Sequence, residues 1–186
     1  MTLNEVIMIL ILLCDGFEEI EALTPLDLLR RAGLTVKTVG VDSKIAVGAH
    51  NIPVVCDLTP SEVCLDEVLA VILPGGMPGA SNLDKSEFTD LALNSVIKNG
   101  GRIGAICAAP FILGKRGLLN GKNATCYPGF EEYLDGANVK SESVITDGNI
   151  TTARGMGVAL AFAKELVELI CGKEKANELS LSIMEE

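Results

Sequence analysis

The first long apolar run of the chain, "VIMILILLC" from Val6 to Cys14, is hydrophobic at every position. A strand with one face in water alternates apolar and polar residues, whereas a strand covered on both faces is apolar throughout. Comparable runs recur in "AVILPGG" (residues 70–76) and "RIGAI" (residues 102–106), and helix-like segments separate them. This alternation of buried strands and helices predicts an α/β fold, with a mainly parallel sheet and helices on both of its faces.

Weaker patterns outline the rest of the chain. A helix that follows the first strand is expected to end near residues 31–33. The other expected elements are a strand over residues 35–41, a small β-hairpin over 44–55, helices to about 98, a hairpin over 143–153, a helix over 157–170 and a short acidic helix after it. Because the 186 residues contain no linker, repeat or low-complexity tract, residues 1–186 are expected to form one domain.

Composition narrows the possible functions. The net charge is −10, and nucleic acid and anionic membranes are therefore not expected as partners, because both require basic surface. The apolar run at residues 6–14 is too short to span a bilayer, and no Lys or Arg precedes it, so no signal peptide is expected. The six cysteines form no C-x-x-C pair and have no histidines clustered beside them. This pattern predicts free thiols in a reducing cytoplasm and no bound metal.

No cofactor is expected either. The segment "GLLNGKN" (residues 117–123) is similar to a phosphate-binding P-loop only superficially, since its spacing is one residue short and Asn123 stands where Ser or Thr is required. No G-x-G-x-x-G motif follows a strand, and the loop after the first strand is acidic. An acidic loop repels a flavin or nucleotide phosphate.

A parallel sheet binds ligands beyond the carboxyl ends of its strands. Three segments occupy such positions, namely "CDGFEEIE" (residues 14–21), "PGGMPGA" (74–80) and "CAAP" (107–110). Cys107 lies between a buried strand and Pro110, which suits the first turn of a helix. Such a junction can present a nucleophile to the N–H groups of the helix start, and these should lower the pKa of the thiol. The alternative is that Cys107 is one more small buried hydrophobic residue.

Histidine is a weak candidate for the base beside Cys107. The single histidine, His50, lies upstream in the predicted hairpin and could approach the cysteine only through the fold or from a second subunit. It is more simply interpreted as a solvated hairpin residue. A Cys–His–acid hydrolase is therefore not favoured.

A carboxylate is the stronger candidate. At about 100° per residue, Glu21 shares a narrow arc of the first helix with the residues that should face the sheet, namely Pro25, Leu28 and Ala32. Glu18 lies at the edge of this arc, and Glu19 points elsewhere. Acidic residues are also favoured at helix N-termini, whatever their function. This preference is enough to explain Glu18 and Glu19. For Glu21, both the preference and a role in chemistry stay open.

A thiol and a carboxyl in contact would repel each other if both were ionised, so the pair should share one proton. We expect a protonated Glu21 that donates a hydrogen bond to the sulfur of Cys107. Such a pair is an oxidisable nucleophile that needs no histidine.

Three motifs in order, "EEIE" after the first strand, the "LPGG" loop and the "GAICAAP" junction, resemble the ThiJ/PfpI superfamily. The nearest branch is that of the parkinsonism-associated protein deglycase and its bacterial relatives. The resemblance runs from about Val6 to Lys175 and includes "LLRRAG", "ARGMG" and "GKEKA". It implies a flavodoxin-like fold, a homodimer, and glyoxalase-type or deglycase activity on small reactive carbonyls, together with oxidative-stress sensing and chaperone behaviour.

The same resemblance implies roles for individual residues. Cys107 resembles the reactive cysteine, held in a strained backbone conformation, and Glu21 resembles the glutamic acid that hydrogen-bonds to it. Gly76 and Ala108 resemble the backbone N–H donors of the oxyanion pocket. Ala108 also differs from the protease branch, which has His directly after the cysteine. In the strand expected after the junction helix, Tyr127 replaces a histidine found in some relatives.

Tyr127 could donate a hydrogen bond, but its reference pKa near about 10 makes it a poor base at neutral pH. Proton abstraction would then be carried out by Glu21. Two functions remain open: a cysteine-dependent enzyme acting on reactive dicarbonyls or glycated groups, and a non-catalytic redox sensor or holdase chaperone that uses the same pocket.

Overall fold

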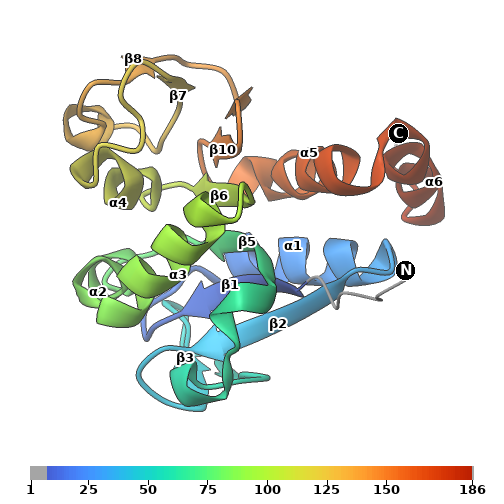
Figure 1. Cartoon of the computed structure of the whole chain (residues 1–186). Helices are drawn as coiled ribbons and strands as arrows, with labels where there is room; N and C mark the ends of the chain where they lie inside the picture. Colours follow the sequence, from blue (N-terminus) through green and yellow to red (C-terminus); the bar gives the residue numbers. More distant parts are fainter. Residues whose placement is uncertain (1–7, 186) are drawn as a thin grey trace.

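A six-stranded sheet forms the centre of the structure, a computed structural model that describes residues 8–185 (Figure 1). From edge to edge its strands are β2 (Thr35–Gly40), β1 (Met8–Leu13), β5 (Val68–Leu73), β6 (Arg102–Ile106), β10 (Ile150–Ala153) and β9 (Val144–Asp147). Neighbouring strands are parallel except for β9, which runs antiparallel to β10. The predicted mainly parallel sheet is confirmed, while the expected strand start at Val6 lies outside the described residues.

Helices cover both faces of this sheet, as predicted (Figure 1). One face carries α1 (Glu19–Arg31), α5 (Ala159–Cys171) and α6 (Lys173–Ser182), and the other carries α2 (Gly79–Lys85), α3 (Glu87–Lys98) and α4 (Pro110–Lys115). Successive side chains of β1 point to opposite faces, so that Ile11 packs under the first group of helices and Leu12 under the second. Because both faces are dry, the strand is apolar at every position.

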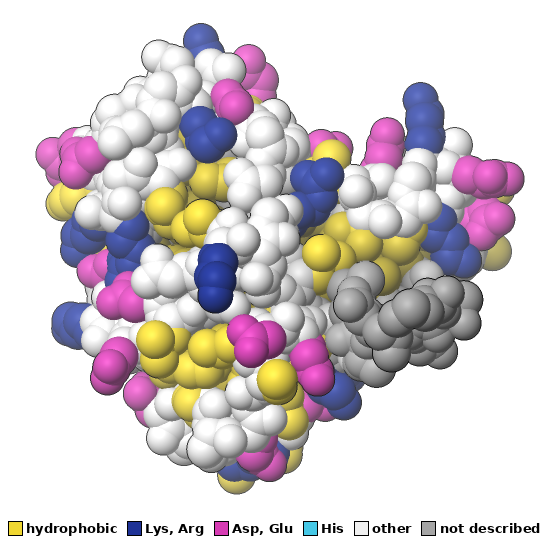
Figure 2. Space-filling view, viewed as in Figure 1, with side chains coloured by type: hydrophobic (Ala, Val, Ile, Leu, Met, Phe, Trp, Pro, Cys, Tyr) yellow, Lys and Arg dark blue, Asp and Glu magenta, His cyan; other side chains and the backbone are white. Residues whose placement is uncertain are grey.

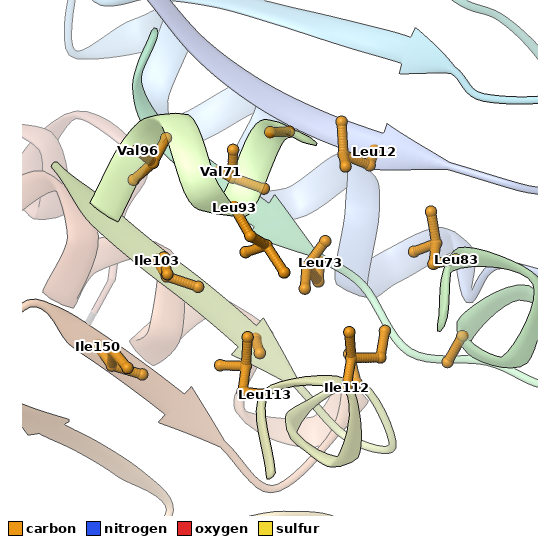
Figure 3. Close-up of a cluster of buried hydrophobic side chains, with 14 of the residues drawn as sticks. Leu12, Val71, Leu73, Leu83, Leu93, Val96, Ile103, Ile112, Leu113 and Ile150 are labelled. Carbon is orange, nitrogen blue, oxygen red and sulfur yellow. The ribbon is translucent and has the colours of Figure 1, made fainter. Parts of the chain in front are cut away.

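Figure 3 shows the buried cluster under the second group of helices. Leu12 of β1, Val71 of β5 and Ile103 of β6 pack there with Leu93 of α3 and Ile112 of α4. Each of these side chains is at most 1% exposed. Full burial of an aliphatic side chain of this size contributes about 1.5–3 kcal/mol. The cluster therefore fixes α3 and α4 against the sheet, and with them the loops at the carboxyl ends of β5 and β6.

The strand order reverses at β1, which has β2 on one side and β5 on the other. In doubly wound sheets, ligand sites form outside the carboxyl ends of the strands at such a reversal. The three segments singled out in the sequence follow β1, β5 and β6, and they meet at this end of the sheet. The topology thus places the candidate site residues together.

The region over residues 143–153 differs from its prediction. β9 and β10 form the expected antiparallel hairpin, but β10 also pairs in parallel with β6 and so extends the central sheet. Without β10, β6 would be the edge of the sheet and would leave backbone N–H and C=O groups unpaired. The hydrophobic pattern alone does not reveal that β10 fills this position. The other predicted hairpin, β3 (Ile45–Val47) with β4 (Pro53–Val55), forms a separate two-stranded sheet as expected.

Two strand predictions extended too far. β5 ends at Leu73 instead of Gly76, because Pro74 has no N–H to continue the ladder. The expected strand around Tyr127 was wrong: β7 (Asn123–Ala124), which pairs with β8 (Asn138–Val139), ends earlier, and Tyr127 lies in a loop before Pro128. A residue that precedes proline is sterically restricted, and the proline cannot donate to a neighbouring strand.

The surface has a mixed character on the face seen in Figure 2. Acidic and basic side chains alternate over it with small apolar patches. Within residues 8–185, no helix is long and apolar enough to cross a membrane.

Candidate active site

Cys107 follows directly on β6 and has a backbone φ of +65°, in the left-handed region that non-glycine residues rarely adopt. Two backbone hydrogen bonds hold it there. Its N–H donates to the carbonyl of Ala153 over 2.9 Å, and its own carbonyl accepts the N–H of Tyr127 over 2.8 Å. A strained residue of this kind costs about 1–3 kcal/mol and persists because its surroundings impose it. The α4 helix begins immediately afterwards, with Pro110 in its first turn as predicted.

Glu21 lies in the first turn of α1, and its side chain is only 1% exposed. The N–H of Gly75 donates to its Oε2 over 2.9 Å. The other oxygen, Oε1, has no hydrogen-bond donor of ordinary geometry among the described residues. The carboxyl as a whole interacts with the Cys107 thiol and with the N–H of Met156. A buried oxygen without a donor is satisfied if it carries the proton itself and donates it. The buried carboxyl thus interacts with the sulfur, and its Oε1 has room to carry a proton.

Gly75 makes this contact possible. A Cβ on Gly75 would lie 2.6 Å from Glu21 Oε2 and 2.7 Å from the Cβ of Cys107. Both distances are far below van der Waals contact, so a larger residue would separate the carboxyl from the cysteine. Sequence reasoning missed Gly75 because only its close approach to two distant segments reveals its importance.

Burial raises the pKa of Glu21 to about 7, against an ordinary value of 4.5. The hydrogen bond with Cys107 acts in the opposite direction, and the negative charge of Glu18 adds to the effect of burial. The direction of this shift favours the protonated form of Glu21. That the carboxyl retains the proton of the pair stays a prediction.

The expected lowering of the Cys107 pKa is not found. Burial, and after it the charge and hydrogen bond of Glu21, raise the pKa of the thiol to about 12. The N–H groups of Ala108 and Gly76 do face the sulfur and lower its pKa, but they are outweighed. Two acids in contact resist losing both protons, so the pair loses its first proton near neutral pH and its second only in strong alkali.

The two expected backbone donors thus flank the sulfur from two loops. Gly76 belongs to the loop after β5 and has a φ of +84°, and Ala108 is the first residue after the cysteine. A Cβ on Gly76 would lie 2.6 Å from the carbonyl oxygen of Gly16, so this loop also packs tightly on the segment after β1. An oxygen that replaced or extended the sulfur would meet both N–H groups.

Tyr127 borders the site, and half of its side chain is exposed. Gly155 lies between it and the cysteine: a Cβ there would be 3.3 Å from the Tyr127 ring and 3.8 Å from the Cys107 sulfur. Gly155 and Tyr127 also line a cavity of about 370 Å³, together with Arg154 and Met156. Gly155 thus borders both this cavity and the sulfur of Cys107.

His50 lies outside this constellation. Its N–H donates to Glu19 Oε1 over 2.7 Å, and its ring Nδ1 lies 2.8 Å from Glu19 Oε2. The His50 side chain is 71% exposed, which agrees with a solvated hairpin residue, but Glu19 is only 5% exposed and is more than a helix-start residue. Glu18 does fill that simpler role, because it caps α1 by accepting the N–H of Glu21 over 2.7 Å.

Glu18, Glu19 and His50 bring three possible metal-ligand atoms within 4.8 Å of one another. The carboxylates, however, already accept hydrogen bonds from protein N–H groups, and these bonds account for the arrangement. In this cluster, Glu18 caps the start of α1, and Glu19 binds His50 and so anchors the helix to the β3–β4 hairpin.

The fold and the site define an α/β protein with a cysteine at a strained strand-to-helix junction and a buried carboxyl directed at its sulfur. Residues 7–169 match the model of the DJ-1/PfpI family, and the chain belongs to this family. The resemblance noted in the motifs is therefore confirmed.

Three relatives illustrate the match. Protein dj-1beta of Drosophila melanogaster is 36% identical over 94% of this chain and 95% of its own length, and its crystal structure superposes with a TM-score of 0.91. The Parkinson disease protein 7 homolog of Danio rerio is 32% identical over 94% of this chain and 95% of its own. The glutathione-independent glyoxalase DJR-1.2 of Caenorhabditis elegans is 33% identical over 89% of each chain.

Proposed function

We propose that this protein is a cysteine-dependent stress-response enzyme of the glyoxalase type that converts small reactive dicarbonyls to hydroxy acids. The observation that carries the proposal is the buried Glu21 carboxyl, with a pKa of about 7, directed at the sulfur of Cys107. A group that must both give and accept a proton works best with a pKa near the operating pH. A relative named as a glutathione-independent glyoxalase, DJR-1.2, supports the assignment.

The reaction begins from the form of the pair that holds a single proton, with that proton on Glu21. The thiolate of Cys107 attacks the aldehyde carbon of a dicarbonyl such as methylglyoxal. Glu21 gives its proton to the resulting alkoxide, and the N–H groups of Gly76 and Ala108 stabilise that oxygen before it is protonated. The product is a hemithioacetal, and Glu21 is now a carboxylate. No proton has left the site.

Glu21 next removes the hydrogen on the former aldehyde carbon and returns it as a proton to the neighbouring carbon. The hydroxyl proton of the hemithioacetal passes to the neighbouring carbonyl oxygen, which leaves a thioester of lactate on Cys107. Water hydrolyses this thioester and releases lactate. The sum is methylglyoxal plus water giving lactate, an internal redox change that needs no external oxidant or cofactor. Tyr127 is positioned to orient the substrate and not to take the proton, since phenols are weak bases at neutral pH. The same attack on carbonyl adducts of thiols or amines would give deglycase activity.

Purified protein and methylglyoxal, without glutathione, provide the test. We expect lactate to form with the wild type and not with Cys107→Ser. Cys64→Ser is the matched control, because Cys64 is an exposed free thiol remote from the motifs of the site. Equal lactate formation by wild type and Cys107→Ser, or none by either, would contradict the proposal.

A redox sensor or holdase chaperone is the second candidate, and the same pocket favours it. The N–H groups of Gly76 and Ala108 face the sulfur and would stabilise the oxygens of a sulfinate. We expect mild peroxide to oxidise Cys107 to sulfinic acid before the other five cysteines, as peptide mass spectrometry after a peroxide titration would measure. Earlier oxidation of Cys56 or Cys64 contradicts this role.

We also propose a cytoplasmic homodimer. Ile20 of α1 is 47% exposed and Leu160 of α5 is 38% exposed, and these two helices pack side by side. Exposed apolar side chains on adjoining helices favour burial against a second copy. A dimer is expected by light scattering at micromolar concentration, and Leu160→Glu should shift it toward monomer. A monomeric wild type would rule the dimer out.

A further inference from the structure

Arg154 occupies an unusual position next to the candidate active site. It follows β10, and the next residue, Gly155, is the one that adjoins the Cys107 sulfur. Its side chain is partly buried and lines two cavities at once. One is the cavity of about 370 Å³ beside Tyr127, and the other, of about 480 Å³, is lined also by Lys140.

The guanidinium of Arg154 has little to bind within the protein. One of its nitrogens donates to the carbonyl of Ser141 over 3.2 Å. Within residues 8–185 it forms no ion pair, whereas Arg30 and Arg116 each bind an aspartate at 2.6–2.7 Å. Glu131 and Glu142 line the larger cavity with Arg154, but among residues 8–185 neither forms an ion pair with it. The guanidinium therefore keeps several donors available for charge-assisted hydrogen bonds with a ligand.

The size of the cavity beside Tyr127 points in the same direction. Pockets that hold ligands are typically about 300–1,000 Å³, and this cavity of about 370 Å³, which Lys140 does not line, falls in that range. A three-carbon dicarbonyl fills only a small part of this space. The planar fork of a guanidinium matches the two oxygens of a carboxylate.

We propose that Arg154 is a specificity-determining residue that binds the carboxylate of an anionic carbonyl substrate while its aldehyde carbon lies at the sulfur of Cys107. The proposal rests on the proposed function for the reaction itself, but the binding of an anionic group at Arg154 is separable from turnover. The favoured substrates are α-oxoaldehydes that carry a carboxylate a few bonds from the aldehyde.

Alkylation of Cys107 tests the binding without any turnover. Iodoacetate and iodoacetamide both alkylate the same sulfur with loss of iodide, and they differ in charge. Both react only with the thiolate, so the ratio of their rates does not depend on how much of the thiol is ionised. N-(2-carboxyethyl)maleimide and N-ethylmaleimide form a longer pair of the same kind. Rates at Cys107, measured by peptide mass spectrometry, are divided by those at the exposed Cys64 of the same molecule.

We expect Arg154→Gln to lower the ratio of the anionic to the neutral reagent at Cys107 by about tenfold for at least one of the two pairs. Arg154→Lys should retain part of the preference for the anionic reagent, and Lys140→Gln should leave the ratio of the two rates unchanged. An unchanged ratio in Arg154→Gln, or an equal loss in Lys140→Gln, overturns the proposal. If Arg154→Gln does not fold, the wild type alone decides. A ratio of anionic to neutral alkylation that is no higher at Cys107 than at Cys64 overturns the proposal.

Turnover provides the second measurement. We expect a higher kcat/KM for 4,5-dioxopentanoate than for its uncharged methyl ester, and Arg154→Gln should remove that preference by raising KM with kcat little changed. A wild type without this preference overturns the proposal while leaving the proposed function intact. If no dicarbonyl is converted at all, the proposed function fails, and the alkylation ratio still decides the role of Arg154.

Discussion

Glu19 and Glu21 stand two residues apart in the first turn of α1, and both carboxyls are buried. Burial acts to raise the pKa of both carboxyls, but the net shift is downward at Glu19 and upward at Glu21. Hydrogen bonds from His50 outweigh burial at Glu19 and hold its pKa below the ordinary value. Glu21 contacts a thiol in place of an imidazole, and its pKa rises to about 7.

The difference shows that the hydrogen-bond donors around a buried carboxyl decide whether the effect of burial on its pKa prevails. Glu19 keeps its charge and anchors the β3–β4 hairpin to α1, where Ala49 also donates its N–H to the carbonyl of Phe17 over 2.8 Å. Glu21 has a raised pKa and interacts with the Cys107 thiol, with which it can exchange a proton. Two nearby positions of one helix thus serve structure and chemistry separately.

The largest expected effect separates the two carboxyls by activity. Glu21→Leu should reduce the conversion of methylglyoxal to lactate by about 100-fold or more, the usual loss when a general acid–base is removed. Glu19→Leu should change it by only a few fold, because Glu19 points to His50. Steady-state kinetics of both variants measure this. A similar loss in both would mean that Glu21 acts only through the shape of α1, and a fully active Glu21→Leu would mean that another base exists.

The next effect is on the pH dependence of stability. The pKa of Glu21 is higher in the folded protein, about 7, than its ordinary value of 4.5, so the folded state binds more protons between these values. Stability should therefore fall as pH rises from about 4.5 to about 7, by roughly 3 kcal/mol from this group. Glu21→Gln should remove this decline. Urea unfolding of both proteins across the range measures it, and identical slopes would contradict a raised pKa.

A pair of glycines offers a smaller, structural comparison. Gly75 makes room for Glu21 and Gly48 makes room for Glu19. Gly75→Ala places a Cβ against the Cβ of Cys107 and should lower the free energy of unfolding by about 1–3 kcal/mol, the usual range for overpacking, and impair activity. Gly48→Ala meets the Glu19 side chain and disturbs the anchor of the β3–β4 hairpin, away from the Cys107 site, so we expect activity to be retained. Calorimetry and turnover check both, and equal losses of activity would contradict the distinction.

The smallest effect concerns the exposed histidine. Its hydrogen bond to Glu19 raises the pKa of His50 above 6.5, so the pair stabilises the protein below that pH and the contribution is lost as pH rises through the folded pKa. His50→Gln should therefore be less stable than the wild type in mildly acidic buffer and nearly equal at alkaline pH. Thermal unfolding at two pH values measures this. A deficit that persists unchanged at alkaline pH would assign the loss to the ring and not to its charge.

The sequence by itself determined the layers of the fold and the position of Cys107. Runs that are apolar at every residue require cover on both faces, and Pro110 marks a helix start directly after a strand; both are local properties of the chain. The helical wheel likewise determined that Glu21 faces the sheet, because its spacing from Pro25, Leu28 and Ala32 is set by the helix alone.

Only the tertiary structure decided the pKa values of the site residues and the contacts that set them. The pKa of Cys107 was expected to fall, but burial and Glu21 raise it, since both depend on segments far apart in the chain. The partnership of Glu19 with His50, the close approach of Gly75 and the unpaired Arg154 were likewise invisible in the sequence. Desolvation and charge interactions depend on distances in space, and the spacing of residues along the chain carries no record of them.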